Sequence, residues 1–209
     1  LAMDQQVDFI VISGDIYDSS NISLRAQLRF MEVLERLGKE GIAVYAIHGN
    51  HDPLDSTKLS MTLPSHVHVF GGEPASVTAV RRSDREEVAV ITGMSYPTSK
   101  VTDNIAIRYP APTSGLYQIG LLHANVNGDP QDETYAPCSK KDLIPAGFHY
   151  WALGHIHSRR TLQESPYIVY PGNIQGRHVR ETGPKGCYVV DVDEDFNTKL
   201  CFHELDSMR

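Results

Sequence analysis

Four short, strongly apolar segments of this sequence each end next to a side chain that can bind a metal ion. The segments are residues 7–13, 42–47, 117–122 and 150–153. Short runs rich in branched aliphatic residues predict buried strands. The metal-capable side chains that follow them are Asp15, Asn50, His123, and His155 with His157. Because ligands of α/β proteins bind beyond the carboxyl ends of the strands, we expect these side chains to converge at one edge.

Glycine stands directly before three of these side chains, in the pairs Gly14-Asp15, Gly49-Asn50 and Gly154-His155. A residue without a Cβ permits a sharp turn and a close approach of two backbones. The repeated glycine therefore predicts a tightly packed site.

The rest of the pattern predicts an α/β fold of two packed mixed β-sheets flanked by helices. Between the first two strands, apolar residues recur at helical spacing from Leu24 to Leu37, with Asn21 or Ser23 as the start and Gly38 or Gly41 as the end. Strand, helix and strand form a right-handed βαβ unit. Further strands are expected at residues 66–70, 75–80, 87–92, 167–170, 186–192 and 200–203, and an irregular loop with a short helix around 101–107.

Composition narrows the class of protein. A chain of 209 residues with 41% hydrophobic residues forms one domain, residues 1–209, whose core needs no structural metal, so a metal found here would be functional. The uncharged apolar runs, residues 9–12 among them, are all far shorter than a membrane-spanning helix needs. Three scattered cysteines and the lack of a signal sequence favour the cytoplasm.

The predicted ligands are a carboxylate, an amide oxygen and three imidazoles, with no thiolate. This mixture suits Mn²⁺, Fe or Zn²⁺ in an open catalytic site. The carboxylate of Asp15 has enough lone pairs to bridge two ions. Two such ions would lower the pKa of a bridging water and neutralise the charge of a phosphate.

The motifs GDIYD (14–18), GNHD (49–52), a lone strand-end histidine and GHIH (154–157) resemble, in this order, the signature of calcineurin-like metallophosphoesterases. The segments YPGNIQGRH (170–178) and GPKG (183–186) further resemble the SbcD-type DNA repair exonucleases and their YhaO-like bacterial branch. The resemblance covers essentially the whole chain and implies a four-layer metallophosphoesterase sandwich.

By this resemblance, one metal ion is held by the following residues: Asp15, Asn50, His123 and His155. Asp15 is shared with a second ion, to which His157 belongs. His51 matches the catalytic histidine that contacts the phosphate or protonates the leaving oxygen. By its position and chemistry, Asp52 could orient His51 and keep it protonated. We therefore expect two divalent cations, foremost Mn²⁺, and a metal-activated water as nucleophile.

One feature departs from the family pattern. The family begins with an Asp-x-His pair on a first strand, and no such pair precedes Asp15, so the second metal site keeps only Asp15 and His157. The family's exonucleases also carry a further domain after the phosphoesterase. We therefore expect a core fragment that lacks the first strand and any C-terminal DNA-binding or capping domain.

The resemblance also implies DNA and an SMC-like ATPase subunit as partners and allows a homodimer. A net charge of −7 is unusual for a nucleic-acid enzyme. The segment from His155 to Lys185, however, contains five basic and two acidic residues, a local net charge of +3. We predict that Arg177 and His178 in this region bind the substrate.

Two alternatives to a DNA exonuclease remain. The first is a phosphomonoesterase or small-nucleotide phosphodiesterase of the same fold, and the second is a non-catalytic pseudoenzyme that lacks one metal site. The protein serine/threonine phosphatase branch is disfavoured, because Asp18 is followed by serine rather than arginine and His51 by aspartate rather than glutamate.

Overall fold

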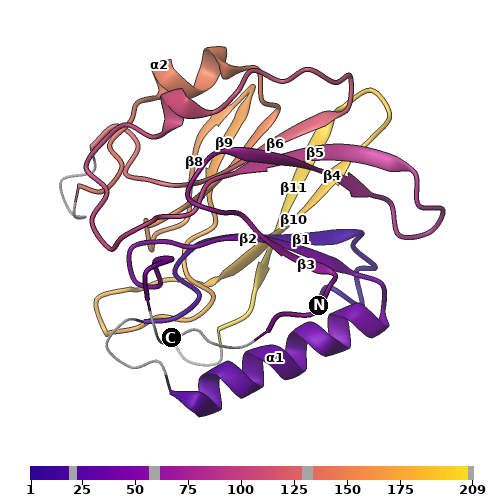
Figure 1. The fold of residues 1–209 in the computed structure, drawn as a ribbon, viewed down its shortest axis with the longest axis horizontal. Helices are drawn as coiled ribbons and strands as arrows, with labels where there is room; N and C mark the ends of the chain where they lie inside the picture. Colours follow the sequence, from indigo (N-terminus) through magenta and orange to yellow (C-terminus); the bar gives the residue numbers. More distant parts are fainter. Residues whose placement is uncertain (19–22, 57–61, 129–133, 207–209) are drawn as a thin grey trace.

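The computed structural model describes residues 1–18, 23–56, 62–128 and 134–206. Its first layer is a parallel sheet in the order β1-β2-β3. The strands are β1 (Phe9–Ser13), β2 (Ala43–Ile47) and β3 (Val67–Val69). Helix α1 (Leu24–Lys39) connects β1 to β2 and covers the outer face of this sheet (Figure 1). The predicted βαβ unit is therefore confirmed.

Both ends of α1 follow from the sequence. Ser23 accepts a hydrogen bond from the backbone N–H of Ala26 at 3.1 Å, which satisfies one free donor of the first turn. Asn21, the other predicted cap, lies outside the described residues. At the far end Gly41 has a φ of +73°, a conformation that glycine adopts without strain. Leu34 and Leu37 face the sheet and are buried against Ile42 and Val44.

A second, six-stranded sheet lies above the first, in the order β4-β5-β6-β7-β9-β8 (Figure 1). Its central pairs are parallel and its two outermost pairs antiparallel. The strands are β4 (Ala75–Val80), β5 (Glu87–Gly93), β6 (Tyr117–His123), β7 (Tyr150–Gly154), β8 (Arg160–Glu164) and β9 (Tyr167–Tyr170). The sequence did not predict β8, because this edge strand is mostly polar and lacks the apolar run of the others.

Short helices belong to the outer side of the second sheet. They are α2 (Lys140–Leu143) and the 3₁₀ turns η1 (Ala106–Arg108) and η2 (Ile144–Ala146). The helix predicted around 101–107 is thus a single 3₁₀ turn at its end. An outer cluster around Trp151 includes Leu143 and Ala106, which joins these helices to the sheet.

The core between the sheets fixes the layered arrangement. Tyr45 and Ile47 of the first sheet are buried in the same cluster as Ile91, Leu121 and Val169 of the second. Together with the helix layers, this is the expected four-layer sandwich. No helix in the described part of the chain has the length and apolar character to span a membrane.

A two-stranded antiparallel sheet completes the fold. It consists of β10 (Gly186–Val192) and β11 (Thr198–Glu204). Tyr188 and Leu200 of this hairpin pack against the core between the two main sheets.

The four strands that precede the predicted metal ligands do not share one sheet. β1 and β2 belong to the first sheet, whereas β6 and β7 belong to the second. Sequence alone could not separate them, because all four are short parallel strands of similar apolar composition, although β1 is only half-buried. They meet because the end of β1 packs against the second sheet, where the Ser13 hydroxyl donates to the Ala152 carbonyl at 2.9 Å. The candidate site therefore lies where the two sheets join.

Candidate metal centre

His123, at the end of β6, is completely buried at the centre of the site. Its Nδ1 lies 2.8 Å from the carbonyl oxygen of Ser13. A carbonyl only accepts, so Nδ1 carries a proton and donates. The other ring nitrogen, Nε2, lies 2.9 Å from Oδ1 of Asn50 and 3.4 Å from Oδ2 of Asp15. Residues at or after strand ends of both sheets thus bring together three atoms that can bind a metal ion: Nε2 of His123, Oδ1 of Asn50 and Oδ2 of Asp15.

These three atoms need a positive charge among them. A neutral ring protonated at Nδ1 would direct its Nε2 lone pair at two oxygens, which is repulsive unless a proton or a metal ion lies between. Burial opposes protonation of His123, but the Asp15 carboxylate outweighs it and raises the pKa of the ring. Burial likewise opposes ionisation of Asp15, yet contacts with His123 and with the His51 N–H lower its pKa to about 2. The donor set fits a borderline divalent cation.

Asn50 adds an amide oxygen to this group of atoms. In the described residues, no three His, Cys, Asp or Glu side chains are placed to hold a metal ion by themselves. Beside Asp15 and His123, the amide oxygen of Asn50 is the third atom of a type that binds metal ions.

His155, which follows β7, lies beside this group. Its ring packs edge-to-face on the His123 ring, with 5.4 Å between the centroids, and on Tyr135 at 5.6 Å. Its backbone φ is +92°, and that of Asp15 is +53°, both in the left-handed region that non-glycine residues rarely adopt. Backbone strain of this kind clusters at functional sites.

The glycines before the ligands allow the close approach that the sequence predicted. A Cβ on Gly154 would lie 1.8 Å from the carbonyl oxygen of Ser13, and one on Gly49 would lie 2.4 Å from Oδ1 of Asp15. Both positions therefore exclude any larger residue.

Asp52 lies between the two loops that carry the predicted ligands. Its carboxylate is completely buried and accepts backbone hydrogen bonds from Asp15 (3.1 Å), Ile16 (2.8 Å) and Gly49 (2.7 Å). These bonds tie the GDIYD and GNHD loops together, and they use the oxygens that were expected to orient His51. The carboxylate of Asp52 is therefore held by the loop backbone, and its action on His51 stays a prediction.

Asp18 takes the place beside His51 that was predicted for Asp52. Oδ1 of Asp18 lies 3.5 Å from Nδ1 of His51, and the other carboxylate oxygen accepts a hydrogen bond from the Arg177 guanidinium. The signal in the sequence was the second aspartate of GDIYD. Arg177 thereby contacts the GDIYD loop, although it lies 159 residues further along the chain.

His157 and His178 are joined by a residue that the sequence reasoning missed. Oε1 of Glu181 lies 2.7 Å from Nδ1 of His157 and 3.6 Å from Nε2 of His178. His157 is thus held by Glu181, whereas the His178 side chain is 58% exposed. Burial opposes ionisation of Glu181, but the Arg177 N–H and the His157 ring lower its pKa. The sequence pointed to Glu181 only in that it is an isolated acidic residue within a basic segment.

Tyr96 is a second residue that sequence reasoning missed. Its ring packs edge-to-face on His123 at 5.2 Å, and its hydroxyl is buried without a hydrogen-bond partner among the described residues. Burial, and next the charge of Asp15, raise the pKa of this hydroxyl, so it stays neutral.

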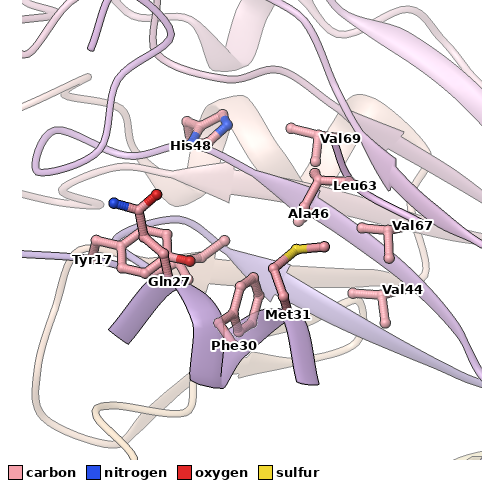
Figure 2. A pocket seen from close by; sticks show the side chains of 11 residues that line it. Tyr17, Gln27, Phe30, Met31, Val44, Ala46, His48, Leu63, Val67 and Val69 are labelled. Atoms are coloured by element: carbon pink, nitrogen blue, oxygen red, sulfur yellow. The ribbon is translucent and has the colours of Figure 1, made fainter. Parts of the chain in front are cut away.

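A pocket of about 140 Å³ lies between α1 and the first sheet, next to the GDIYD and GNHD loops. Figure 2 shows Phe30 and Met31 of the helix facing Val44 and Val67 of the sheet, with His48 at one end. This largely apolar lining suits neither a phosphate nor a metal ion. The pocket is therefore not part of the metal centre.

Comparison with known proteins identifies the family of this chain. The family model described as "Calcineurin-like phosphoesterase" matches residues 1–159, and the chain belongs to this family of metallophosphoesterases. Enzymes of this family generally use divalent metal ions.

The curated relatives confirm the resemblance to the YhaO-like branch. The chain is 41% identical over 192 residues to the uncharacterized metallophosphoesterase YhaO of Bacillus subtilis (strain 168), an alignment that covers 91% of this chain and 47% of the relative. It is 27% identical to the DNA double-strand break repair protein Mre11 of Thermoplasma acidophilum, over 92% of this chain and 53% of the relative. It is 25% identical to a subunit of the nuclease SbcCD of B. subtilis, over 92% and 58%. The chain therefore spans about half the length of these relatives.

Proposed function

We propose that this protein is a metal-dependent phosphodiesterase that hydrolyses DNA as an exonuclease in DNA repair. The observation that carries the proposal is the convergence of Asp15, Asn50 and His123 at the junction of the two sheets, with His51 and Arg177 beside them. The named relatives include a nuclease subunit and a double-strand break repair protein, which supports DNA as the substrate class.

The residues proposed to hold the first cation are Asp15, Asn50, His123 and His155. Asp15 and His157 would contribute to a second. Mn²⁺ fits this mixture of oxygen and imidazole ligands, with Fe and Zn²⁺ as alternatives. When bound, such ions lower the pKa of a water molecule and offset the charge of a phosphate.

His51 is proposed to act on the scissile phosphate. Its backbone N–H donates to Oδ1 of Asp15 at 2.9 Å, which fixes the residue next to the metal-binding carboxylate. Its Nδ1 faces Asp18, so Nε2 is the nitrogen that can contact the phosphate or protonate the leaving oxygen. His51 thus acts beside the metal without serving as a ligand.

Substrate binding is assigned to the loop that carries Arg177 and His178. The Arg177 side chain is 43% exposed, and its planar guanidinium has donors beyond the one given to Asp18. The region from His155 to Lys185 carries the local positive balance within an acidic chain. We further propose that DNA and an SMC-like ATPase subunit are its partners and the cytoplasm its location.

The test compares three substrates with Mn²⁺: linear duplex DNA, bis-p-nitrophenyl phosphate and p-nitrophenyl phosphate. A DNA exonuclease is expected to cleave DNA and the diester and to act poorly on the monoester. Arg177→Ala should weaken DNA binding and reduce its log-log salt slope by about one unit, while cleavage of the small diester changes much less.

Two results would contradict this proposal. Equal losses on DNA and on the small diester would assign Arg177 to the scissile phosphate and favour a small-nucleotide phosphodiesterase, a reading that the net charge of −7 supports. No metal-dependent hydrolysis of any of the three would favour a pseudoenzyme.

A further inference from the structure

Glu181 is the centre of a polar network that joins two separate parts of the candidate site. One oxygen, Oε1, contacts Nδ1 of His157 at 2.7 Å. The other, Oε2, accepts from the backbone N–H of Arg177 at 2.9 Å and from Nδ2 of Asn173 at 3.2 Å. The Glu181 side chain is only 9% exposed, so these bonds are largely shielded from water.

The chemistry of Glu181 selects one tautomer of His157. A carboxylate only accepts hydrogen bonds, so the proton on the neutral ring has to be at Nδ1. The lone pair is then at Nε2, which is the nitrogen left for a metal ion. Carboxylates that accept from the far nitrogen of a metal-binding histidine fix its orientation and raise its basicity.

We propose that Glu181 is a positioning residue that holds the His157 ring ready for a divalent cation and couples that cation to the substrate loop. The proposal rests on the proposed function, in which His157 is a metal ligand. The coupling has a continuous physical path, because the same carboxylate holds the Arg177 backbone while the Arg177 guanidinium holds Asp18.

The coupling has to act in both directions. If an ordered loop favours the cation at His157, the cation must stabilise the loop by the same free energy. The Arg177 amide reports on this, because its hydrogen bond to Glu181 has to break before the amide proton can exchange.

Glu181→Gln is a shape-conserving test whose outcome follows from the network. The glutamine keeps one accepting oxygen. With that oxygen towards Arg177 and Asn173, two bonds survive and the NH₂ group donates to His157, which forces the ring proton to Nε2. With the opposite rotation, the NH₂ group faces two donors. We therefore expect the first arrangement and a change of His157 from the Nδ1–H to the Nε2–H tautomer.

The first measurement is made on metal-free protein by long-range ¹H–¹⁵N NMR of the histidine rings. Wild type should show His157 protonated at Nδ1, and Glu181→Gln should show it at Nε2. Asn173→Ala removes a bond to Glu181 but leaves the one to His157, so it should keep the Nδ1–H form and controls for a loosened loop. Glu194→Gln, at an exposed position, controls for loss of charge. An unchanged tautomer in Glu181→Gln would overturn the proposal.

The second measurement is calorimetric titration with Mn²⁺. Glu181→Gln should weaken the ion at His157 by about 10- to 100-fold, with Glu194→Gln unchanged and Asn173→Ala weakened much less. Addition of Zn²⁺, which is diamagnetic, should slow exchange of the Arg177 amide in wild type but not in Glu181→Gln. Metal binding that is equal in wild type and Glu181→Gln would overturn this inference and leave the proposed function standing. Absence of metal binding in wild type, with the tautomer change observed, would instead contradict the proposed function and the coupling to a cation.

Discussion

Replacement of Asp52 by asparagine should destabilise the fold rather than remove a catalytic group. The carboxylate accepts three backbone hydrogen bonds in a completely buried position. An asparagine oxygen can keep the bonds from Asp15 and Gly49, but its NH₂ group then faces the N–H of Ile16. One charge-assisted hydrogen bond is lost and the other two become bonds to a neutral acceptor. At typical values per bond, the free energy of unfolding should fall by about 2 to 5 kcal/mol.

The assay is urea-induced unfolding together with hydrolysis of bis-p-nitrophenyl phosphate. For Asp52→Asn, the remaining activity should follow the fraction of folded, metal-loaded protein. Asp18→Asn, beside His51 and only partly buried, should lower kcat with little change in stability. Asp55→Asn, at an exposed position three residues along the chain, is the matched control and should change neither.

The reasoning would be refuted by the opposite pattern. If Asp52→Asn unfolded at the same urea concentration as wild type and yet lost kcat, the carboxylate would be acting on the reaction. The prediction from sequence would then have been right, and the assignment of Asp52 to the loops wrong.

Three further predictions follow from the geometry of the site. His51→Ala should lower kcat by about 10²- to 10⁴-fold with metal content unchanged, as measured by elemental analysis, and loss of the metal would make His51 a ligand. Gly154→Ala should cost about 1 to 3 kcal/mol in urea unfolding, because its Cβ would overlap the Ser13 carbonyl, and wild-type stability would contradict the packing of β1 on β7. Burial raises the pKa of the Cys138 thiol to about 12, so at pH 8 it is protonated and should react with a thiol reagent far more slowly than the exposed Cys201. Equal labelling of the two cysteines would show that Cys138 is accessible.

The parts of the fold that sequence predicted well are those with a strong local cause. Ser23 can cap α1 because its hydroxyl sits one turn before the free N–H groups, and the apolar run that became β6 can only be buried. The partition of strands between sheets has no such local cause. It depends on which strand faces pack against one another in the interior. The sequences of β1 and β6 have similar apolar patterns, although the two strands lie in different sheets.

The candidate site shows the same division. Residue types and their order pointed to Asp15, Asn50 and His123, because strand ends and glycines constrain where those side chains go. The partner of His51 could not be predicted, because neighbours in sequence point in different directions in a tight loop. Asp52 turns inward to the backbone, and Asp18, from another loop, faces the ring.

The central claim is that the oxygen of Asn50 and the ring of His123 help to hold a catalytic divalent cation. The most direct measurement titrates metal-free wild type and Asn50→Ala with Mn²⁺ by calorimetry and follows diester hydrolysis in the same samples. Hydrolysis by wild type should rise in step with bound metal, and Asn50→Ala should bind at least about tenfold more weakly while its circular dichroism spectrum stays unchanged. Equal Mn²⁺ affinity in the two proteins, or full hydrolysis after removal of metal by a chelator, would contradict the account.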